Sequence, residues 1–199
     1  MNKTLFLFST LLFFECADAQ STFVFQNRSV SGSIDAPVFD SLGFPLSGGS
    51  FLAELYGSAA SNSLAPTTTL ELQLRITLPF ATGAYAGYFA PNNAVMTVWD
   101  TVPGGSAWLQ VRAWDARLGV TYEDVVALGI GGFGESPLFY ADGGDPTGLE
   151  APGPLFGLES FNLRPIIPEP SASALLAVGG VAWWIVRRQR GPFGRGDVL

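Results

Sequence analysis

The chain has 199 residues, a formal net charge of −7, one cysteine and no histidine. Without histidine, Ser-His-Asp and Cys-His catalytic systems and most zinc sites are excluded. Residues 20–165 carry thirteen acidic and five basic side chains, a net charge of −8. Because such a surface repels phosphate backbones, we expect no nucleic-acid partner.

The first nineteen residues predict a secretory signal peptide. Lys3 provides a basic start, residues 5–14 are mostly apolar, and Ala17 and Ala19 are small residues at the two positions that determine cleavage. Cleavage after Ala19 would remove the only cysteine, Cys16, so the exported domain must be stable without disulfides. The alternatives are a lipoprotein cysteine, disfavoured by the charge beside it, and an uncleaved anchor, disfavoured by the shortness of the run.

Alternation of apolar and polar residues dominates the middle of the chain and predicts strands. It is longest over residues 70–78, where five aliphatic side chains would share one face of a strand. Shorter runs of this type occupy residues 22–25, 51–56, 94–99, 108–114, 138–140 and 158–163. Turn-forming clusters lie at residues 47–50, 91–93, 103–106 and 142–146. The predicted class is all-β, with residues 20–165 forming a single β-sandwich of about seven short antiparallel strands.

One short helix is also predicted. Thr121 followed by Asp124 resembles a capping box, with aspartate in place of the usual glutamate. Residues 122–128 then provide about two turns, and Gly129 is placed to end them.

Carboxylates are the remaining candidates for catalysis. Asp115 could pair with Glu123 or Asp124, but nothing in the sequence sets the separation that glycoside hydrolysis needs. A solvated acidic surface is the simpler interpretation. We therefore predict that the protein is not an enzyme and has no catalytic residues and no cofactor.

A calcium site at Asp142 and Asp145 is a second hypothesis, because hard cations favour clustered carboxylates on a flexible loop. Two carboxylates are too few for a dedicated site, and Asp and Gly residues are common in turns for conformational reasons. We favour the turn and predict no metal.

Aromatic residues indicate a binding face. Trp108 and Trp114 share parity along one predicted strand, with Gln110 and Arg112 between them. Indole rings on an exposed sheet face can stack against sugar rings, so these four residues predict a glycan-binding strip. The alternative is that the tryptophans pack inside the protein, as large aromatic residues usually do. Residues 109, 111 and 113 have the opposite parity and are apolar, which predicts the core face.

The end of the chain has the features of a membrane anchor. A linker, residues 166–170, contains Pro168, Glu169 and Pro170, and residues 171–186 form an uninterrupted apolar run that predicts a transmembrane helix. The basic tail, residues 187–199, begins with a cluster that would stop transfer on the cytoplasmic side, made of Arg187, Arg188 and Arg190. The alternative is that the run is the last buried helix of the domain.

These features resemble the PEP-CTERM sorting tail of exported bacterial proteins. In that family a Pro-Glu-Pro motif precedes a short transmembrane helix and an arginine-rich end, together with an N-terminal signal peptide. The resemblance implies recognition by an exosortase-like membrane protease that cuts the tail. Residues 35–40, 51–57 and 111–115 are also similar to small β-rich domains that occur with this tail and have no assigned activity.

Together, these observations predict an exported, non-catalytic protein of the cell envelope or extracellular matrix. The C-terminal helix would first hold it in the inner membrane, and the expected partners are the membrane and an exosortase-like protease. The alternative function is that of a carbohydrate-binding module, with an extracellular polysaccharide as its partner.

Overall fold

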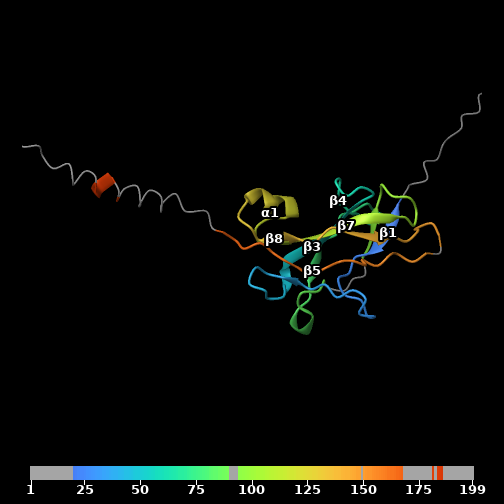
Figure 1. The fold of residues 1–199 in the computed structure, drawn as a ribbon, viewed down its shortest axis with the longest axis horizontal. Helices are drawn as coiled ribbons and strands as arrows, with labels where there is room; N and C mark the ends of the chain where they lie inside the picture. The colour runs from blue at the N-terminus through green and yellow to red at the C-terminus, as the bar shows by residue number, and fades with distance from the viewer. Residues whose placement is uncertain (1–19, 90–93, 149, 168–180, 182, 186–199) are drawn as a thin grey trace, which may run out of the picture.

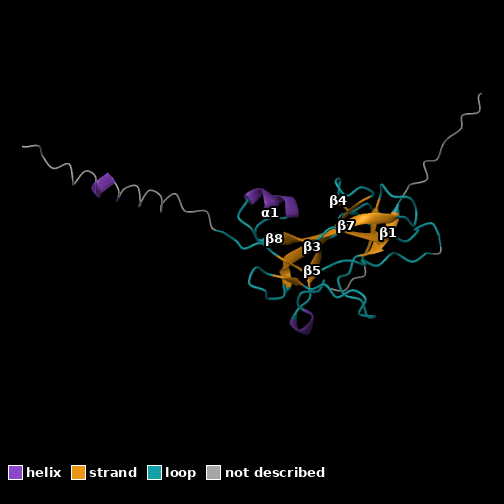
Figure 2. Ribbon diagram, in the orientation of Figure 1, coloured by secondary structure: helices purple, strands orange, loops and turns teal. Residues whose placement is uncertain are grey.

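The computed structural model describes residues 20–89, 94–148, 150–167, 181 and 183–185. Within residues 20–167 the described chain is strand-rich, with ten strands, one α-helix and one short 3-10 helix at Gly83–Tyr85. The α-helix, α1, spans Tyr122–Leu128 and lies beside the largest sheet (Figures 1 and 2). The predicted signal peptide, the Pro-Glu-Pro motif and the arginine cluster lie outside the described residues.

The largest sheet is built on two long antiparallel strands, β3 (Gly48–Ser58) and β7 (Ser106–Asp115). They pair from Phe51 opposite Asp115 to Ser58 opposite Trp108. Four short strands extend the sheet: β4 (Ala65–Pro66) and β5 (Leu78–Phe80) pair with β3, and β8 (Phe133–Glu135) and β9 (Phe139–Asp142) pair with β7.

Two smaller strand pairs complete the fold. β1 (Ser21–Val24) pairs antiparallel with β6 (Val95–Val98). β2 (Val38–Phe39) pairs with β10 (Phe161–Asn162) in parallel, which differs from the predicted all-antiparallel arrangement. This last pair brings together segments from the two ends of the domain sequence.

The main core lies on one face of the β3–β7 pair. Alternate residues of both strands are fully buried there: Ala53, Leu55, Leu109, Val111 and Ala113. Phe23 of β1 and Met96 of β6 belong to the same buried cluster. The predicted core face of residues 108–114 is therefore confirmed, because strict alternation in a strand assigns every second side chain to one face.

The strand predicted for residues 70–78 is wrong over most of its length. Residues 70–72 form a turn, and Leu72 and Leu74 are 71% and 55% exposed. Thr69 closes this loop locally, because its N–H donates to the carbonyl of Leu74 at 2.9 Å and its carbonyl accepts from the N–H of Gln73 at 3.1 Å. Alternation alone does not make a strand when the segment folds back on itself instead of joining the sheet.

Two other local predictions have opposite outcomes. The turn predicted at residues 47–50 is wrong, because β3 already begins at Gly48. The predicted helix is confirmed: the Thr121 hydroxyl accepts from the N–H of Asp124 at 3.2 Å, and the Asp124 carboxylate accepts from the N–H of Thr121 at 3.0 Å. Gly129 ends α1 in the left-handed conformation, with a φ of 70°.

Four residues of the predicted transmembrane helix are described, Val181 and residues 183–185, and all four are helical. Within the described part of the chain, no helix combines the length and apolar character needed to cross a membrane.

Candidate functional site

The candidate site is the face of the β3–β7 pair opposite the main core, which we call the outer face. It carries the four residues of the predicted strip, Trp108, Gln110, Arg112 and Trp114, because they alternate with the buried residues of β7. The register of the two strands places Ser58, Tyr56, Glu54 and Leu52 of β3 directly opposite them. The two ends of this face have different surroundings.

At one end, Trp114 is fully buried and cannot contact a ligand. It forms a second, smaller apolar cluster with Tyr122 and Val125 of α1 and Phe133 of β8. The rings of Trp114 and Tyr122 meet edge to face, with centroids 6.4 Å apart. The prediction of an exposed strip is therefore wrong at Trp114, because α1 covers this end of the outer face.

Arg112 is also held by internal contacts. Its guanidinium lies 4.0 Å from the ring centroid of Tyr56 and 5.1 Å from that of Tyr122. Its Nε donates to the side-chain oxygen of Gln110 at 3.0 Å. Cation–π contacts of this kind stabilise a partly desolvated arginine by about 0.5–2 kcal/mol. Arg112 thus links the covered and uncovered parts of the outer face.

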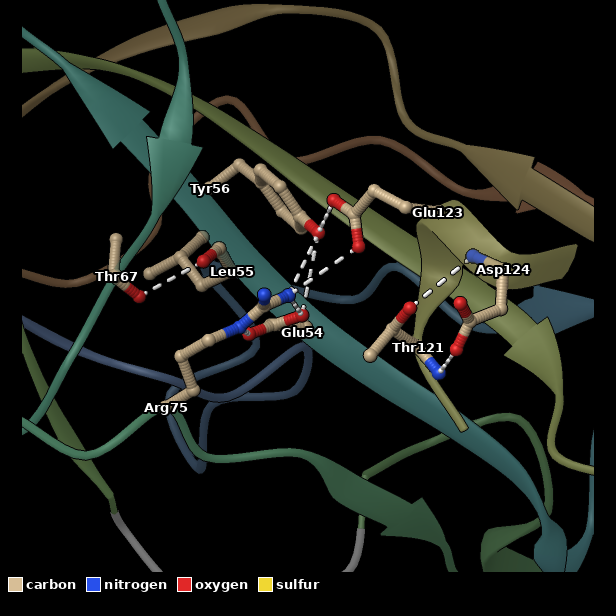
Figure 3. A network of polar contacts seen from close by, with 8 residues as sticks. All are labelled: Glu54, Leu55, Tyr56, Thr67, Arg75, Thr121, Glu123 and Asp124. Atoms are coloured by element: carbon tan, nitrogen blue, oxygen red, sulfur yellow. Dashed lines mark hydrogen bonds and ion pairs between the residues drawn. The ribbon is translucent and has the colours of Figure 1, made fainter. Parts of the chain in front are cut away.

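A polar network lies next to Arg112 and joins three segments of the chain (Figure 3). Glu54 of β3 has a side chain only 1% exposed, and Arg75 of the 70–77 loop binds both its carboxylate oxygens, with Nε–Oε1 and Nη2–Oε2 distances of 2.7 and 2.6 Å. The Tyr56 hydroxyl accepts from Arg75 Nη2 at 3.1 Å and donates to Glu123 of α1. The network therefore fastens both the loop and the helix to β3.

The titration behaviour of this network follows from burial and pairing. Burial, followed by the hydrogen bond to Glu123, raises the pKa of Tyr56 well above its ordinary value. The hydrogen bond to Glu54 raises the pKa of Arg75. Burial works to raise the pKa of Glu123, but the hydrogen bond from Tyr56 and the charge of Arg75 outweigh it and lower that pKa. Tyr56 is thus neutral and Arg75 and Glu123 are charged near neutral pH.

The carboxylates considered for catalysis all have structural partners. Asp115 is buried and accepts two hydrogen bonds from the Arg117 guanidinium, at 2.8 and 2.6 Å. Glu123 belongs to the network, and Asp124 belongs to the capping box of α1.

The proposed calcium ligands also make local hydrogen bonds. Asp145 accepts from the N–H and the hydroxyl of Thr147, both at 2.8 Å, and Asp142 accepts from the hydroxyl of Ser106 at 2.6 Å. Asp145 therefore takes part in the turn that we favoured. Among the described residues, no three side chains of the metal-binding types gather into a group that could hold a metal ion.

At the other end of the outer face, an aromatic pair is partly exposed to solvent. Trp108 is half-buried, and Tyr140 of β9, its partner across the strand pair, is 54% exposed. Their ring centroids are 5.0 Å apart with an angle of 53° between the rings. We call Trp108 and Tyr140 the aromatic platform. Sequence analysis did not identify Tyr140 as a site residue. The only indication in the sequence was its position in the predicted strand 138–140, where it alternates with Phe139 and so lies on the other face.

A cavity of about 220 Å³ lies near the same end of β3. Its lining includes Trp99, Asp100 and Pro66. Asp100 accepts a hydrogen bond from the hydroxyl of Ser58 at 2.6 Å, and Ser58 is paired with Trp108 across the strands. A carboxylate of the cavity lining is therefore hydrogen-bonded to the β3 residue that lies directly opposite Trp108.

The residues expected to direct sorting, Pro168, Glu169, Pro170, Arg187, Arg188 and Arg190, lie outside the described part of the chain. Comparisons of the chain with protein-family models, with curated proteins and with solved structures gave no match.

Proposed function

We propose that the chain is an exported, non-catalytic protein of the cell envelope or extracellular matrix, sorted through its C-terminal tail. The observation that carries this proposal is the order of Pro168-Glu169-Pro170, an apolar run and an arginine cluster, at the opposite end from the predicted signal peptide. The tail would hold the protein in the inner membrane until an exosortase-like protease cuts it.

We further propose that the strand-rich domain is a β-sandwich. The large sheet would form one layer, and the β1–β6 and β2–β10 pairs would form the other. Support comes from the main buried cluster, which combines Leu55 and Val111 of the large sheet with Phe23, Val38 and Phe161 of the two smaller pairs. This cluster stabilises a domain, residues 20–165, that contains no cysteine.

The non-catalytic part of the proposal is supported by the hydrogen bonds that the carboxylates of β3, β7 and α1 already accept. The carboxylates of Glu54 and Asp115 are buried and bound by arginines, and that of Glu123 accepts from Tyr56. Hydrolysis of a polysaccharide or an ester by the purified protein would overturn this part.

Sorting can be tested by expressing the chain in a host that has an exosortase, beside a Glu169→Ala variant. Peptide mapping by mass spectrometry would define the C-terminus of each. We expect the wild type alone to lose the residues after the Pro-Glu-Pro motif. An intact tail in both proteins would contradict sorting and leave a membrane-anchored domain.

A second candidate function, carbohydrate binding, is supported by the aromatic platform. Tyr140 presents its phenol ring to solvent, and the half-buried indole of Trp108 packs against it. The half-buried amide of Gln110, which binds Ser136 and Arg112, alternates with Trp108 on the same face. Stacking of sugar rings on such a surface, with an amide at its edge, would not require Trp114. The glycan surface that we propose is therefore smaller than the strip predicted from the sequence.

Glycan-array screening of the wild type, Trp108→Ala and Tyr140→Ala would test this second function. Tyr85→Ala is a matched control, because Tyr85 is 58% exposed and lies away from the platform on the 3-10 helix. We expect polysaccharide binding that both platform variants lose and the control keeps. Binding that survives both platform substitutions, or no binding by the wild type, would reject the platform as a glycan site.

A further inference from the structure

The chain leaves the body of the domain along a segment that is hydrogen-bonded to it. The N–H of Gly132 donates to the carbonyl of Arg164 at 2.9 Å. The N–H of Arg164 in turn donates to the carbonyl of Phe133 at 2.8 Å. The N–H of Ile167 donates to the carbonyl of Ile130 at 2.7 Å. This exit segment lies at the same end of the molecule as α1 and β8, whereas β1 lies at the opposite end (Figure 1).

The connection from this segment to the apolar run is short. Only residues 168–170 separate Ile167 from the start of the run at residue 171. Even fully extended, four residue steps cover at most about 14 Å. When the run is inserted in a bilayer, the exit end of the domain therefore cannot move far from the lipid surface.

The surface at this end is apolar. Ile166 and Ile167 of the exit segment are 47% and 68% exposed, and Leu128, the last residue of α1, is 47% exposed. The hydrogen bond between Ile167 and Ile130 places the exit segment directly after α1 and Gly129 in space. We call these three side chains, Leu128, Ile166 and Ile167, the exit face. In water they leave apolar area unburied, at a cost of roughly 25 cal/mol per Å².

Two exposed arginines, each paired with a carboxylate, lie at this end of the domain. The side chains of Arg117 and Arg164 are 67% and 61% exposed. Arg164 stacks on the ring of Phe133, 4.8 Å from its centroid, so its aliphatic stem lies along an apolar surface. Arg164, whose ion pair with Glu135 is 3.7 Å long, can turn to lipid phosphates while neighbouring apolar groups enter the interface, whereas Arg117 stays bound to Asp115 at 2.6 Å. The acidic residue Glu123, at the start of α1, is instead directed to Tyr56 and Arg75.

We propose that the exit face is a lipid-docking surface, so that the domain lies with α1 and the exit segment against the membrane from which its tail emerges. This inference rests on the proposed function, since it requires the apolar run to be in the bilayer. It explains why the exposed Ile166 and Ile167 directly precede the Pro-Glu-Pro motif. It also implies that the aromatic platform, at the other end of β7, remains accessible while the domain is anchored.

Site-specific labelling tests the proposal on the full chain. Because Cys16 is the only cysteine, a Cys16→Ser background accepts one new labelling site at a time. Leu128→Cys reports on α1, and Val102→Cys is the control, because Val102 is 68% exposed and its carbonyl accepts from Ser21 at the start of β1. Each protein, carrying an environment-sensitive fluorophore, is reconstituted into vesicles of phosphatidylethanolamine and phosphatidylglycerol that contain a headgroup-labelled quencher lipid.

We expect a blue shift and a loss of fluorescence at position 128, with neither at position 102. Labels that stay water-exposed at both positions on a chain that floats with the vesicles would overturn the docking surface but leave the anchor intact. A chain that does not float with the vesicles would overturn the docking surface and the anchored state together. Equal quenching at both positions would also overturn the proposal, because it would show no preferred face.

Discussion

Trp108 and Trp114 belong to the same strand and the same face, six positions apart, yet they have opposite surroundings. Trp114 is fully buried beneath α1, whereas Trp108 is half-buried beside the exposed ring of Tyr140. Parity along a strand decides which face a side chain occupies. Whether that face is covered depends on a segment elsewhere in the chain, here α1. The outer face is thus interior-like at one end and open to solvent at the other.

The covered end is also where the charged groups of the outer face are fixed. Glu54, Arg75 and Glu123 come from a strand, a loop and a helix and meet through the Tyr56 hydroxyl (Figure 3). Burying a carboxylate is unfavourable unless it is paired and hydrogen-bonded, and Glu54 meets both conditions. The covered end therefore contributes to stability, and the uncovered end is the part free to bind.

The largest expected effect is a difference in stability between variants of the two tryptophans. Trp114→Ala would leave a cavity beneath α1 and should lower the free energy of unfolding by about 3–5 kcal/mol. Trp108→Ala removes a half-buried ring and should cost about 1 kcal/mol. Denaturant unfolding of both variants, followed by circular dichroism, would measure the difference. Equal losses would show that α1 does not bury Trp114 more deeply than Trp108.

Next in size is the loss of the buried carboxylate. Glu54→Gln keeps the side-chain volume but leaves Arg75 with only the more distant Glu123, at 3.5 Å, as a charged partner, and should cost about 2 kcal/mol because hydrogen bonds to charged groups are strong. Glu135→Gln is the control: Glu135 is 3.7 Å from Arg164 and both are solvent-exposed, so about 0.5 kcal/mol or less is expected. A similar cost for the two variants in denaturant titrations would contradict a specific role for the network.

A smaller effect should follow from weakening the helix that forms the cover. Thr121→Ala removes the N-cap of α1 and should cost about 1 kcal/mol. Hydrogen exchange followed by mass spectrometry should then show faster exchange in residues 114–128 and unchanged exchange in residues 106–110. Faster exchange along all of β7 would indicate that the two ends of the outer face do not open independently.

The smallest effect concerns pH. Hydrogen bonds from Arg117 lower the pKa of Asp115 below 3.8, although burial opposes them. A lowered folded-state pKa contributes stability that is present above the ordinary pKa and is lost as the pH falls through the folded-state value. The difference in Tm between the wild type and Asp115→Asn should therefore shrink as the pH falls below about 3.8. Calorimetry over this range would show it, and a constant difference would mean that Arg117 does not hold the charged form.

Sequence analysis predicted the elements whose determinants are local. The capping box at Thr121 and the glycine at position 129 define α1 within a few residues. Alternation identified the buried face of β7 because that strand is long and lies in the middle of the sheet. The same pattern misled at residues 70–78, where hydrogen bonds to Thr69 fold the chain into a loop and Arg75 reaches Glu54.

The candidate site depended on contacts that no local pattern encodes. The pairing of Trp108 with Tyr140 requires β7 and β9 to be neighbours, and the burial of Trp114 requires α1 to cross the outer face. The parallel pair of β2 and β10 likewise joins residues from opposite ends of the domain sequence. The identity of the four strip residues could be read from the sequence, but their exposure could not.

The central claim, export followed by sorting, is tested most directly by the intact mass of the protein outside the cell. The full chain has a mass of 21.1 kDa. In a host with an exosortase, we predict an extracellular or envelope species that begins at Gln20 and ends at or near the Pro-Glu-Pro motif. Recovery of only the full-length or signal-cleaved chain, still bound to the inner membrane, would contradict the claim.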